Sequence, residues 1–168
     1  MHIENVTINI GHGSAMASAF LASLVAGRSS PEPDTKEDAP SEFTPPAIGE
    51  EWPAQGGIYV GISRGEDGEP DAHLVLLPDV VDKGMPWADA VKWAEDLGNG
   101  ARLPTRFESA LLYANVRDQL DTDHWHWTGT PASEGYAWGQ DFNDGGQDDH
   151  GTSYGGRARA VRLIPLGS

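Results

Sequence analysis

The stretch Ala101–Glu108 reads ARLPTRFE, and its second half carries the signal for the start of a helix. Thr105 and Glu108 have the T-x-x-E spacing of a capping box, in which each side chain accepts a hydrogen bond from a backbone N–H that the first helical turn leaves free. A helix is therefore expected to begin at Thr105. Its buried stripe is predicted from apolar residues at helical spacing, which are Phe107, Ala110, Leu111 and Ala114.

A further helix is predicted just upstream, over residues 86–97. Pro86 suits the first position of a helix, where a backbone N–H is not needed, and Gly98 suits its end. The apolar residues between them fall on one face at helical spacing: Trp87, Ala90, Val91, Ala94 and Leu97. The middle of the chain is thus expected to hold two amphipathic helices.

Strand patterns lie on both sides of the two helices. Residues 57–63 (GIYVGIS) and 73–77 (HLVLL) look like strands joined by the polar turn 64–69. Shorter strands are expected after the helices at residues 125–128, 136–142 and 157–164, with a long Gly/Asp loop at 143–156. Strands, two helices and strands again predict an α+β fold with short antiparallel strands in a segregated sheet.

The chain is expected to have three parts. Residues 1–27 combine a strand pattern with a short alanine-rich helix, residues 28–46 form a proline-rich acidic linker, and residues 47–168 form the main domain. The apolar run 15–26 is too short to cross a membrane, and it lacks the positive flank of a secretory signal. Because the first part is too small to fold alone, we expect it to serve in anchoring or homo-oligomerisation.

Composition narrows the classes of function. The chain has 168 residues, a formal net charge of −15 and no cysteine. Disulfides and thiolate chemistry are therefore excluded, and charge repulsion disfavours direct binding to nucleic acid. Neither a G-x-S-x-G motif nor a phosphate-binding glycine loop is present, and no carboxylate pair stands out. We therefore expect a protein that is not an enzyme and has no catalytic residues.

The densest polar cluster of the sequence is an acidic, glycine-rich segment. Asp141, Asn143 and Gly146 begin like a calcium-binding loop, since carboxylates are ligands that this cation prefers. The twelfth position of the pattern is Thr152, where a bidentate glutamate is required. The segment is interpreted as a solvated acidic loop without a cofactor, and calcium binding stays open as the alternative.

Two histidines, His124 and His126, flank Trp125. Side chains two residues apart on a strand face the same way, so the two imidazoles could share a metal or an anion. No third ligand has convincing spacing. The favoured interpretation places Trp125 and Trp127 inward and both histidines outward, and no metal site is assigned.

Arginines gather around the Leu-Pro-Thr turn and in the last strand pattern, at Arg157, Arg159 and Arg162. In so acidic a chain we expect them to bind local carboxylates and backbone carbonyls rather than an anion. Five residues are therefore assigned structural roles: Arg102, Thr105, Arg106, Glu108 and Arg159.

Five motifs resemble a known family: W-x-x-A-x-x-W-A-x-x-L from Trp87, A-R-L-P-T-R-x-E from Ala101, W-x-W-T-G-T from Trp125, Y-A-W-G-Q-D-F from Tyr136 and R-A-R-A-V-R from Arg157. They make residues 52–165 similar to the C-terminal domain of Lcl-type collagen-like proteins. This resemblance implies a C-type-lectin-like fold. A sixth motif, E-W-P-x-Q-G-G-I-Y-V-G from Glu51, resembles small stand-alone members from phages or prophages.

The resemblance implies ligand or receptor binding at the end of a structural protein. The chain is therefore predicted to be a phage tail- or capsid-associated virion component whose lectin-like head binds a host surface protein or glycan. Other virion proteins are further expected partners. Aromatic rings among small polar residues suit such ligands. The predicted ligand-binding residues are Trp125, Trp127, Tyr136, Trp138, Asn143, Asp144, Gln147, Asp148, Asp149, His150 and Tyr154.

The strong acidity supports an alternative function. An acidic phage protein can act inside the host cell by presenting carboxylates to the basic, nucleic-acid-binding groove of a host defence protein. Such binding would weaken steeply with salt, because it depends on exposed charges. The sequence leaves both functions open.

Overall fold

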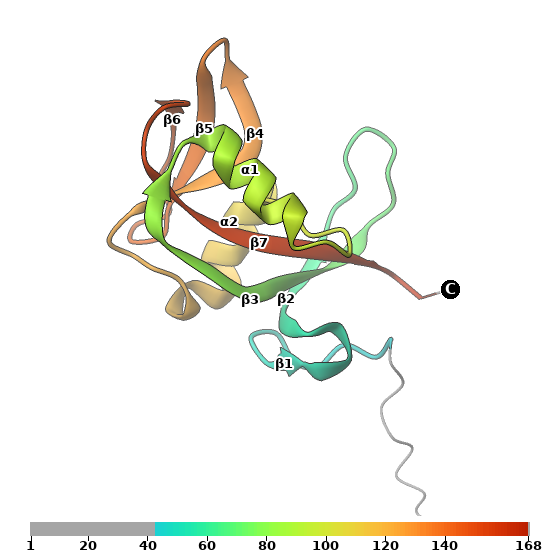
Figure 1. Ribbon diagram of the computed structural model, residues 1–168. Coiled ribbons are helices and arrows are strands. Elements are labelled where there is room, and N and C mark those ends of the chain that lie inside the picture. The colour runs from blue at the N-terminus through green and yellow to red at the C-terminus, as the bar shows by residue number, and fades with distance from the viewer. Residues whose placement is uncertain (1–42, 168) are drawn as a thin grey trace, which may run out of the picture. The chain divides into compact units, whose positions relative to one another are not determined.

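The computed structural model describes residues 43–167 (Figure 1). The expected N-terminal strand, the helix at 15–26 and most of the linker lie outside the described residues. No helix within residues 43–167 has the length and apolar character needed to cross a membrane.

Two consecutive helices lie between two groups of strands, which makes this an α+β fold. The elements are β1 (Glu51–Trp52), η1 (Pro53–Gln55), β2 (Gly57–Ser63), β3 (Ala72–Met85), α1 (Trp87–Asp96), α2 (Arg106–Val116), η2 (Arg117–Gln119), β4 (Trp125–Ser133), β5 (Tyr136–Asp141), β6 (Gln147–Gly151) and β7 (Gly156–Pro165). The strands form one sheet in the order β1-β2-β3-β7-β4-β5-β6. All neighbours are antiparallel except β4 and β7, which meet at the single parallel pair His126 and Arg157.

The centre of the sheet is the antiparallel pair β3 and β7. β3 extends well beyond the predicted strand 73–77, because pairing with β7 continues at Val80 with Arg159 and at Met85 with Gly156. Two register shifts interrupt this ladder. The apolar run therefore marks only the part of β3 that is buried on both faces, while backbone hydrogen bonding sets the length of the strand.

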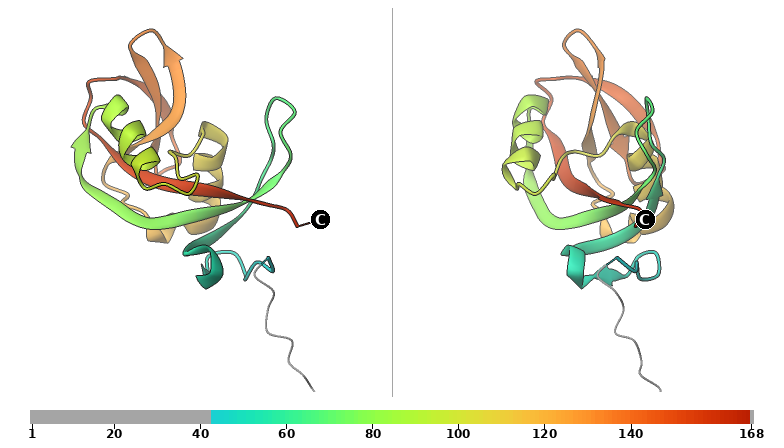
Figure 2. Two further views of the ribbon diagram at one scale, coloured as in Figure 1. Left: turned by 45° about the vertical axis from the view of Figure 1, so that its right-hand side comes forward. Right: turned by 90° about the vertical axis from the view of Figure 1, so that its right-hand side faces the viewer.

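Each face of the central strands packs against one helix. Figure 2 shows α1 and α2 on opposite sides of β3 and β7. Side chains alternate along β3, so Val75 and Leu77 join the core beside α1, while Leu74 and Leu76 join the core beside α2. Trp127 is the largest fully buried side chain and belongs to the first core.

α1 forms close to the predicted position. Ala90 and Ala94 are buried, and Trp87, Val91 and Leu97 pack against the core, as the helical spacing predicts. Pro86 is the N-cap residue rather than the first helical residue, and the Trp87 N–H is bonded to the Thr152 carbonyl at 2.9 Å. The predicted start was thus one residue early. The helix ends at Asp96 with Leu97 as its C-cap, and Gly98 follows with a φ of 75°, which favours glycine.

α2 begins with the predicted capping box, but its buried stripe differs from the prediction. The Thr105 side chain accepts from the Glu108 N–H, and the Glu108 carboxylate accepts from the Thr105 N–H. Phe107 is 74% exposed and Ala110 and Ala114 are also exposed. The stripe instead follows Glu108, Ser109, Leu112 and Val116. The reason is that the Glu108 carboxylate turns inward to Arg102 and Ser63, which sets the rotation of the helix.

The predicted loop 143–156 contains a strand. β6 pairs with β5 through five residue pairs, from Tyr136 with Gly151 to Gln140 with Gln147. Its sequence, QDDHG, lacks the apolar alternation that sequence reading depends on. β6 is the last strand of the sheet, where charged side chains are common because one edge of the strand has no partner strand.

Candidate functional site

Three aromatic rings meet on one face of the β4–β5–β6 sheet, and we call Trp125, His150 and Tyr154 the ring cluster. The centroids of Trp125 and His150 lie 4.7 Å apart with an edge-on angle of 65°. Tyr154 stacks on His150 at 4.9 Å and 22°. These separations are those of favourable aromatic pairs. The three residues come from β4, β6 and the turn that follows β6.

Gly139 on β5 allows the ring cluster to form. A Cβ atom at this position would lie 3.0 Å from Cδ2 of His150 and 3.4 Å from Cε3 of Trp125. Because glycine has no side chain, the two rings can approach each other across the middle strand. The ring cluster therefore depends on the absence of a side chain at Gly139.

The ring cluster reaches solvent through Tyr154, which is 42% exposed, while Trp125 and His150 are half-buried. Trp127 lies beneath it with only 1% of its surface exposed, and its indole N–H donates to the Met85 carbonyl at 2.8 Å. Trp127 is therefore a core residue, and its place in the predicted ligand-binding set was wrong.

The predicted ligand-binding residues do not form one surface, because strand alternation divides them between two faces. Trp138 and Tyr136 alternate with Gly139 on β5 and so point away from the ring cluster. The Arg106 guanidinium lies 3.4 Å from the centre of the Trp138 ring. Arg106 also donates to Gln147 Oε1 at 3.1 Å, and Gln147 Nε2 donates back to the Arg106 carbonyl at 2.8 Å. Gln147 thus links β6 to α2.

Carboxylates of the acidic segment cap their own turns. Asp141 Oδ1 accepts from the Asn143 N–H at 2.7 Å, and Asp144 Oδ1 accepts from the Gly146 N–H at 2.8 Å. These are side-chain-to-backbone bonds typical of Asx turns. Across residues 43–167, no three His, Asp or Glu residues are gathered as metal ligands would be. Asn143, Asp144, Asp148 and Asp149 are exposed.

The arginine of the Leu-Pro-Thr turn forms a buried fork with Glu108. Arg102 donates to the two carboxylate oxygens at 2.6 and 2.7 Å, and the Ser63 hydroxyl donates at 3.0 Å. Glu108 is only 3% exposed. Burial alone would raise the pKa of the Glu108 carboxyl, but Arg102 and the added hydrogen bonds outweigh it and leave the pKa below its usual value. This fork ties β2, the turn and α2 together.

The two histidines of the H-W-H motif differ in burial. His124 is exposed, whereas His126 is 4% exposed and packs edge-on against Phe142 at 5.0 Å. The interpretation that both point to solvent was therefore wrong for His126. The cause is that β4 is covered on both faces, by the α1 core at Trp127 and by the α2 core at His126. Burial lowers the pKa of His126 to about 4, so its imidazole is neutral at pH 7.

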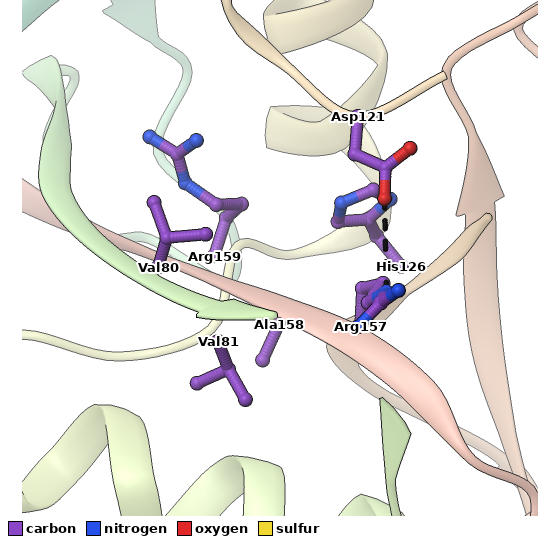
Figure 3. Close-up of a pocket in the computed structure, with 7 residues that line it drawn as sticks. All are labelled: Val80, Val81, Asp121, His126, Arg157, Ala158 and Arg159. Carbon is purple, nitrogen blue, oxygen red and sulfur yellow. Dashed lines mark ion pairs between the residues drawn. The ribbon is translucent and has the colours of Figure 1, made fainter. Parts of the chain in front are cut away.

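A small polar pocket opens beside His126, and we call it the arginine pocket (Figure 3). It has a volume of about 180 Å³ and is lined by Val80, Val81, Asp121, His126, Arg157, Ala158 and Arg159. The Arg157 Nε lies 3.6 Å from Asp121 Oδ2, which also accepts from His124 Nδ1 at 2.8 Å. His124 is thus bound to Asp121, and His126 lines the same pocket as Asp121, so the two histidines do not share a metal or anion site of their own.

Arg159 is one of the residues that line the pocket. Its two terminal nitrogens donate to the Gln119 carbonyl at 3.3 Å and to the Leu77 carbonyl at 3.1 Å. Sequence reading missed the pocket. The usable signal was the R-A-R-A alternation from Arg157, which places two arginines on the face of β7 opposite the alanines.

Comparisons with known proteins extend only to solved structures. No protein-family model matches the chain, and no curated protein matches it. The crystal structure of botrocetin aligns with 62% of this chain and 97% of its own, at 14% identity and a TM-score of 0.41. A complex of the von Willebrand factor A1 domain with botrocetin aligns over the same shares, at 10% identity and a TM-score of 0.38.

Proposed function

We propose that residues 43–167 form a non-enzymatic binding module with a C-type-lectin-like fold, and that the ring cluster is its contact surface. Support for the fold comes from the order of strands, two helices and strands, and from the pairing of β3 with the last strand β7. The five motifs that resemble Lcl-type C-terminal domains span the same part of the chain.

The observation that carries the proposed contact surface is the exposed Tyr154 ring, which stacks on His150, while His150 in turn meets Trp125 edge-on. A ring that is stacked on one face loses little conformational freedom when it binds, and its other face suits a sugar or an apolar protein side chain. Asp148 faces the same side as these rings, because it pairs with Gly139, and it adds an exposed hydrogen-bond acceptor. Rings beside a carboxylate suit a glycan or a protein surface.

We place this module in a phage virion, as a tail- or capsid-associated protein that binds a host surface protein or glycan. The support is the resemblance to stand-alone phage members from Glu51 onward. In this role residues 1–27 anchor the chain to other virion proteins or to further copies of itself. Mass spectrometry of purified particles tests the assignment, and a protein that is abundant in the lysate but missing from the particles contradicts it.

A matched pair of tyrosine variants tests the contact surface. Tyr154 and Tyr136 are 42% and 48% exposed, but they lie on opposite faces of the β4–β5–β6 sheet. We expect Tyr154→Ala to weaken binding of the labelled full-length protein to a glycan array and to intact host bacteria by about tenfold or more. Tyr136→Ala should leave binding unchanged. Equal losses for both variants, or a loss for Tyr136→Ala alone, would refute the ring cluster as the contact surface.

Exposed carboxylates on β6 and the preceding turn support the second candidate function, an acidic inhibitor that binds a basic groove of a host protein. Asp144, Asp148 and Asp149 are all exposed in a chain of net charge −15. An inhibitor of a basic groove would use them in place of phosphates. Immobilised poly-lysine is a suitable probe. If binding to it falls steeply with salt and Asp148→Asn/Asp149→Asn weakens it, whereas Tyr154→Ala does not, the inhibitor function is favoured over the lectin-like one.

A further inference from the structure

A groove opens between the end of β2 and the first turns of α2, and we call it the Phe107 groove. It has a volume of about 340 Å³, and its apolar walls are Ile62 from β2 and Phe107 and Leu111 from α2. Phe107 is 74% exposed and Ile62 is 47% exposed. Large apolar side chains that are exposed side by side are typical of surfaces by which proteins recognise one another.

The apolar surface extends from the groove to Gly61 and Ile48. A Cβ atom at Gly61 would lie 3.8 Å from Cδ1 of Ile48 and 3.9 Å from Cδ2 of Leu111, so both side chains lie close to the bare backbone of this glycine. Ile48 is 54% exposed. Ile48, Leu111, Phe107 and Ile62 therefore form one apolar strip across β2 and α2.

Three charged side chains also line the Phe107 groove, and two of them are already paired. Arg64 forms an ion pair with Asp71 at 3.0 Å, and Glu108 forms one with Arg102 at 2.6 Å. The third is Glu66, which takes part in no ion pair within residues 43–167. The free charge at the rim of the groove is therefore negative.

The turn between β2 and β3 adds negative charge beside the groove. Asp67 and Glu69 lie in this turn with Glu66, all three are exposed, and Figure 2 shows the turn projecting from the sheet. This acidic rim disfavours two other occupants of an apolar strip. It would repel an anionic membrane, and a second copy of the chain would be repelled as well, because each copy has a net charge of −15.

We infer that the Phe107 groove binds a short, basic and amphipathic segment of a partner protein. The apolar side chains of this segment lie against Phe107, Leu111 and Ile62, and a lysine or arginine beside them pairs with Glu66. The volume is at the lower end of the range of roughly 300–1,000 Å³ for ligand pockets, so it suits a few side chains. This groove is separate from the ring cluster, which lies over the α1 core, and does not depend on the proposed contact surface.

The probe is a short, fluorescently labelled helical peptide of leucine and lysine whose leucines lie on one face. We expect it to bind the full-length protein with micromolar affinity and to shift the ¹⁵N amide signals of Ile62, Phe107 and Leu111. A peptide of the same composition, with its leucines spread around the helix, should bind about tenfold more weakly. No binding, equal binding of the two peptides, or signals that shift around Tyr154 instead would overturn the proposal.

Two pairs of variants locate the peptide. Phe107→Ala should weaken its binding about tenfold or more, whereas Tyr154→Ala, which removes an exposed ring elsewhere, should leave the affinity unchanged. Glu66→Gln should weaken binding about two- to fivefold through the loss of an exposed ion pair. Glu134→Gln is the charge-matched control, because Glu134 is exposed and lies outside the groove lining. Full affinity in Phe107→Ala, or equal losses in the two glutamate variants, would overturn the assignment.

Light scattering of the full-length protein tests for a second copy as the occupant. Phe107→Ala should leave the oligomeric state unchanged, because the groove is assigned to a different protein. If this variant instead converts an oligomer into a monomer, another copy of the chain fills the groove and the assignment is wrong.

Discussion

At the scale of single residues, His126 and Glu108 are both buried ionisable groups beside the α2 core, but they are buried in different charge states. His126 is buried as a neutral ring, and burial holds its pKa at about 4. Glu108 is buried as a carboxylate, and Arg102, Ser63 and the Thr105 N–H stabilise its charge. Both residues make the stability of the fold depend on pH, but in different pH windows.

His126 should make the fold less stable as pH falls from about 6.5 to about 4. The unfolded chain binds a proton at the ordinary histidine pKa of about 6.5, whereas the folded chain resists it until about pH 4. The free energy of unfolding should therefore fall by up to about 3 kcal/mol across this window. Urea titrations at several pH values measure it. The decrease in the free energy of unfolding with falling pH should be smaller in His126→Gln and unchanged in the exposed-site control His124→Gln. An undiminished decrease in His126→Gln would contradict the burial of a neutral ring.

Arg102→Met should destabilise the fold by about 3 kcal/mol at pH 7, because it leaves the Glu108 carboxylate buried without its counter-ion. The pKa of Glu108 is lowered in the folded protein, so its contribution to stability is present above the unfolded pKa and is lost as pH falls through the folded value. The difference between the variant and the natural protein should therefore shrink in acid. A difference that stays constant down to pH 3 would show that lost packing, not charge, is the cause.

At the scale of the elements, α2 shows how one side chain can orient a helix. Apolar spacing favours a stripe through Phe107 and Leu111, yet the observed stripe follows Glu108 and Leu112. The inward-facing carboxylate is fixed by Arg102, and the rest of the helix must follow it. Phe107 is left on the surface, where it lines a groove of about 340 Å³ with Ile62 and Leu111.

Two substitutions in α2 test this orientation. Leu112→Ala should lower the free energy of unfolding by about 2–5 kcal/mol, because Leu112 is fully buried beside Leu74 and Phe142. Phe107→Ala should change it by less than about 1 kcal/mol, although it removes the larger side chain. Chemical denaturation of both variants measures these changes in the free energy of unfolding. The apolar pattern alone predicts a large loss for Phe107→Ala, and finding that loss would mean that the helix is rotated.

At the scale of the whole molecule, one sheet separates two hydrophobic cores, and it carries both the ring cluster and the arginine pocket. The α1 core lies under the ring cluster, and the α2 core borders the arginine pocket. Both cores are built from residues after position 51, and the last strand, β7, completes them by pairing with β3 in the sheet. The described part of the chain therefore has the packing of a domain that can fold by itself.

A shortened chain that begins at residue 43 should unfold at the same temperature as the full chain, within about 2 °C. If residues 1–27 serve in homo-oligomerisation, as the sequence predicts, the shortened chain should also be monomeric while the full chain is not. Calorimetry measures the first property and light scattering after size-exclusion chromatography measures the second. A large drop in melting temperature would mean that the N-terminal part belongs to the domain.

The sequence by itself determined those features whose causes are local. The capping box at Thr105 and Glu108, the turn at Gly98, the apolar face of α1 and the order of strands and helices all depend on neighbours within a few residues. Tertiary structure alone decided the rest. β6 exists because β5 offers it an edge, His126 is buried because β4 is covered on both faces, and the arginine pocket forms where β3, β4 and β7 meet. Such contacts join residues far apart in the chain, and β6 lacks the apolar alternation by which a sequence specifies the pairing of a strand.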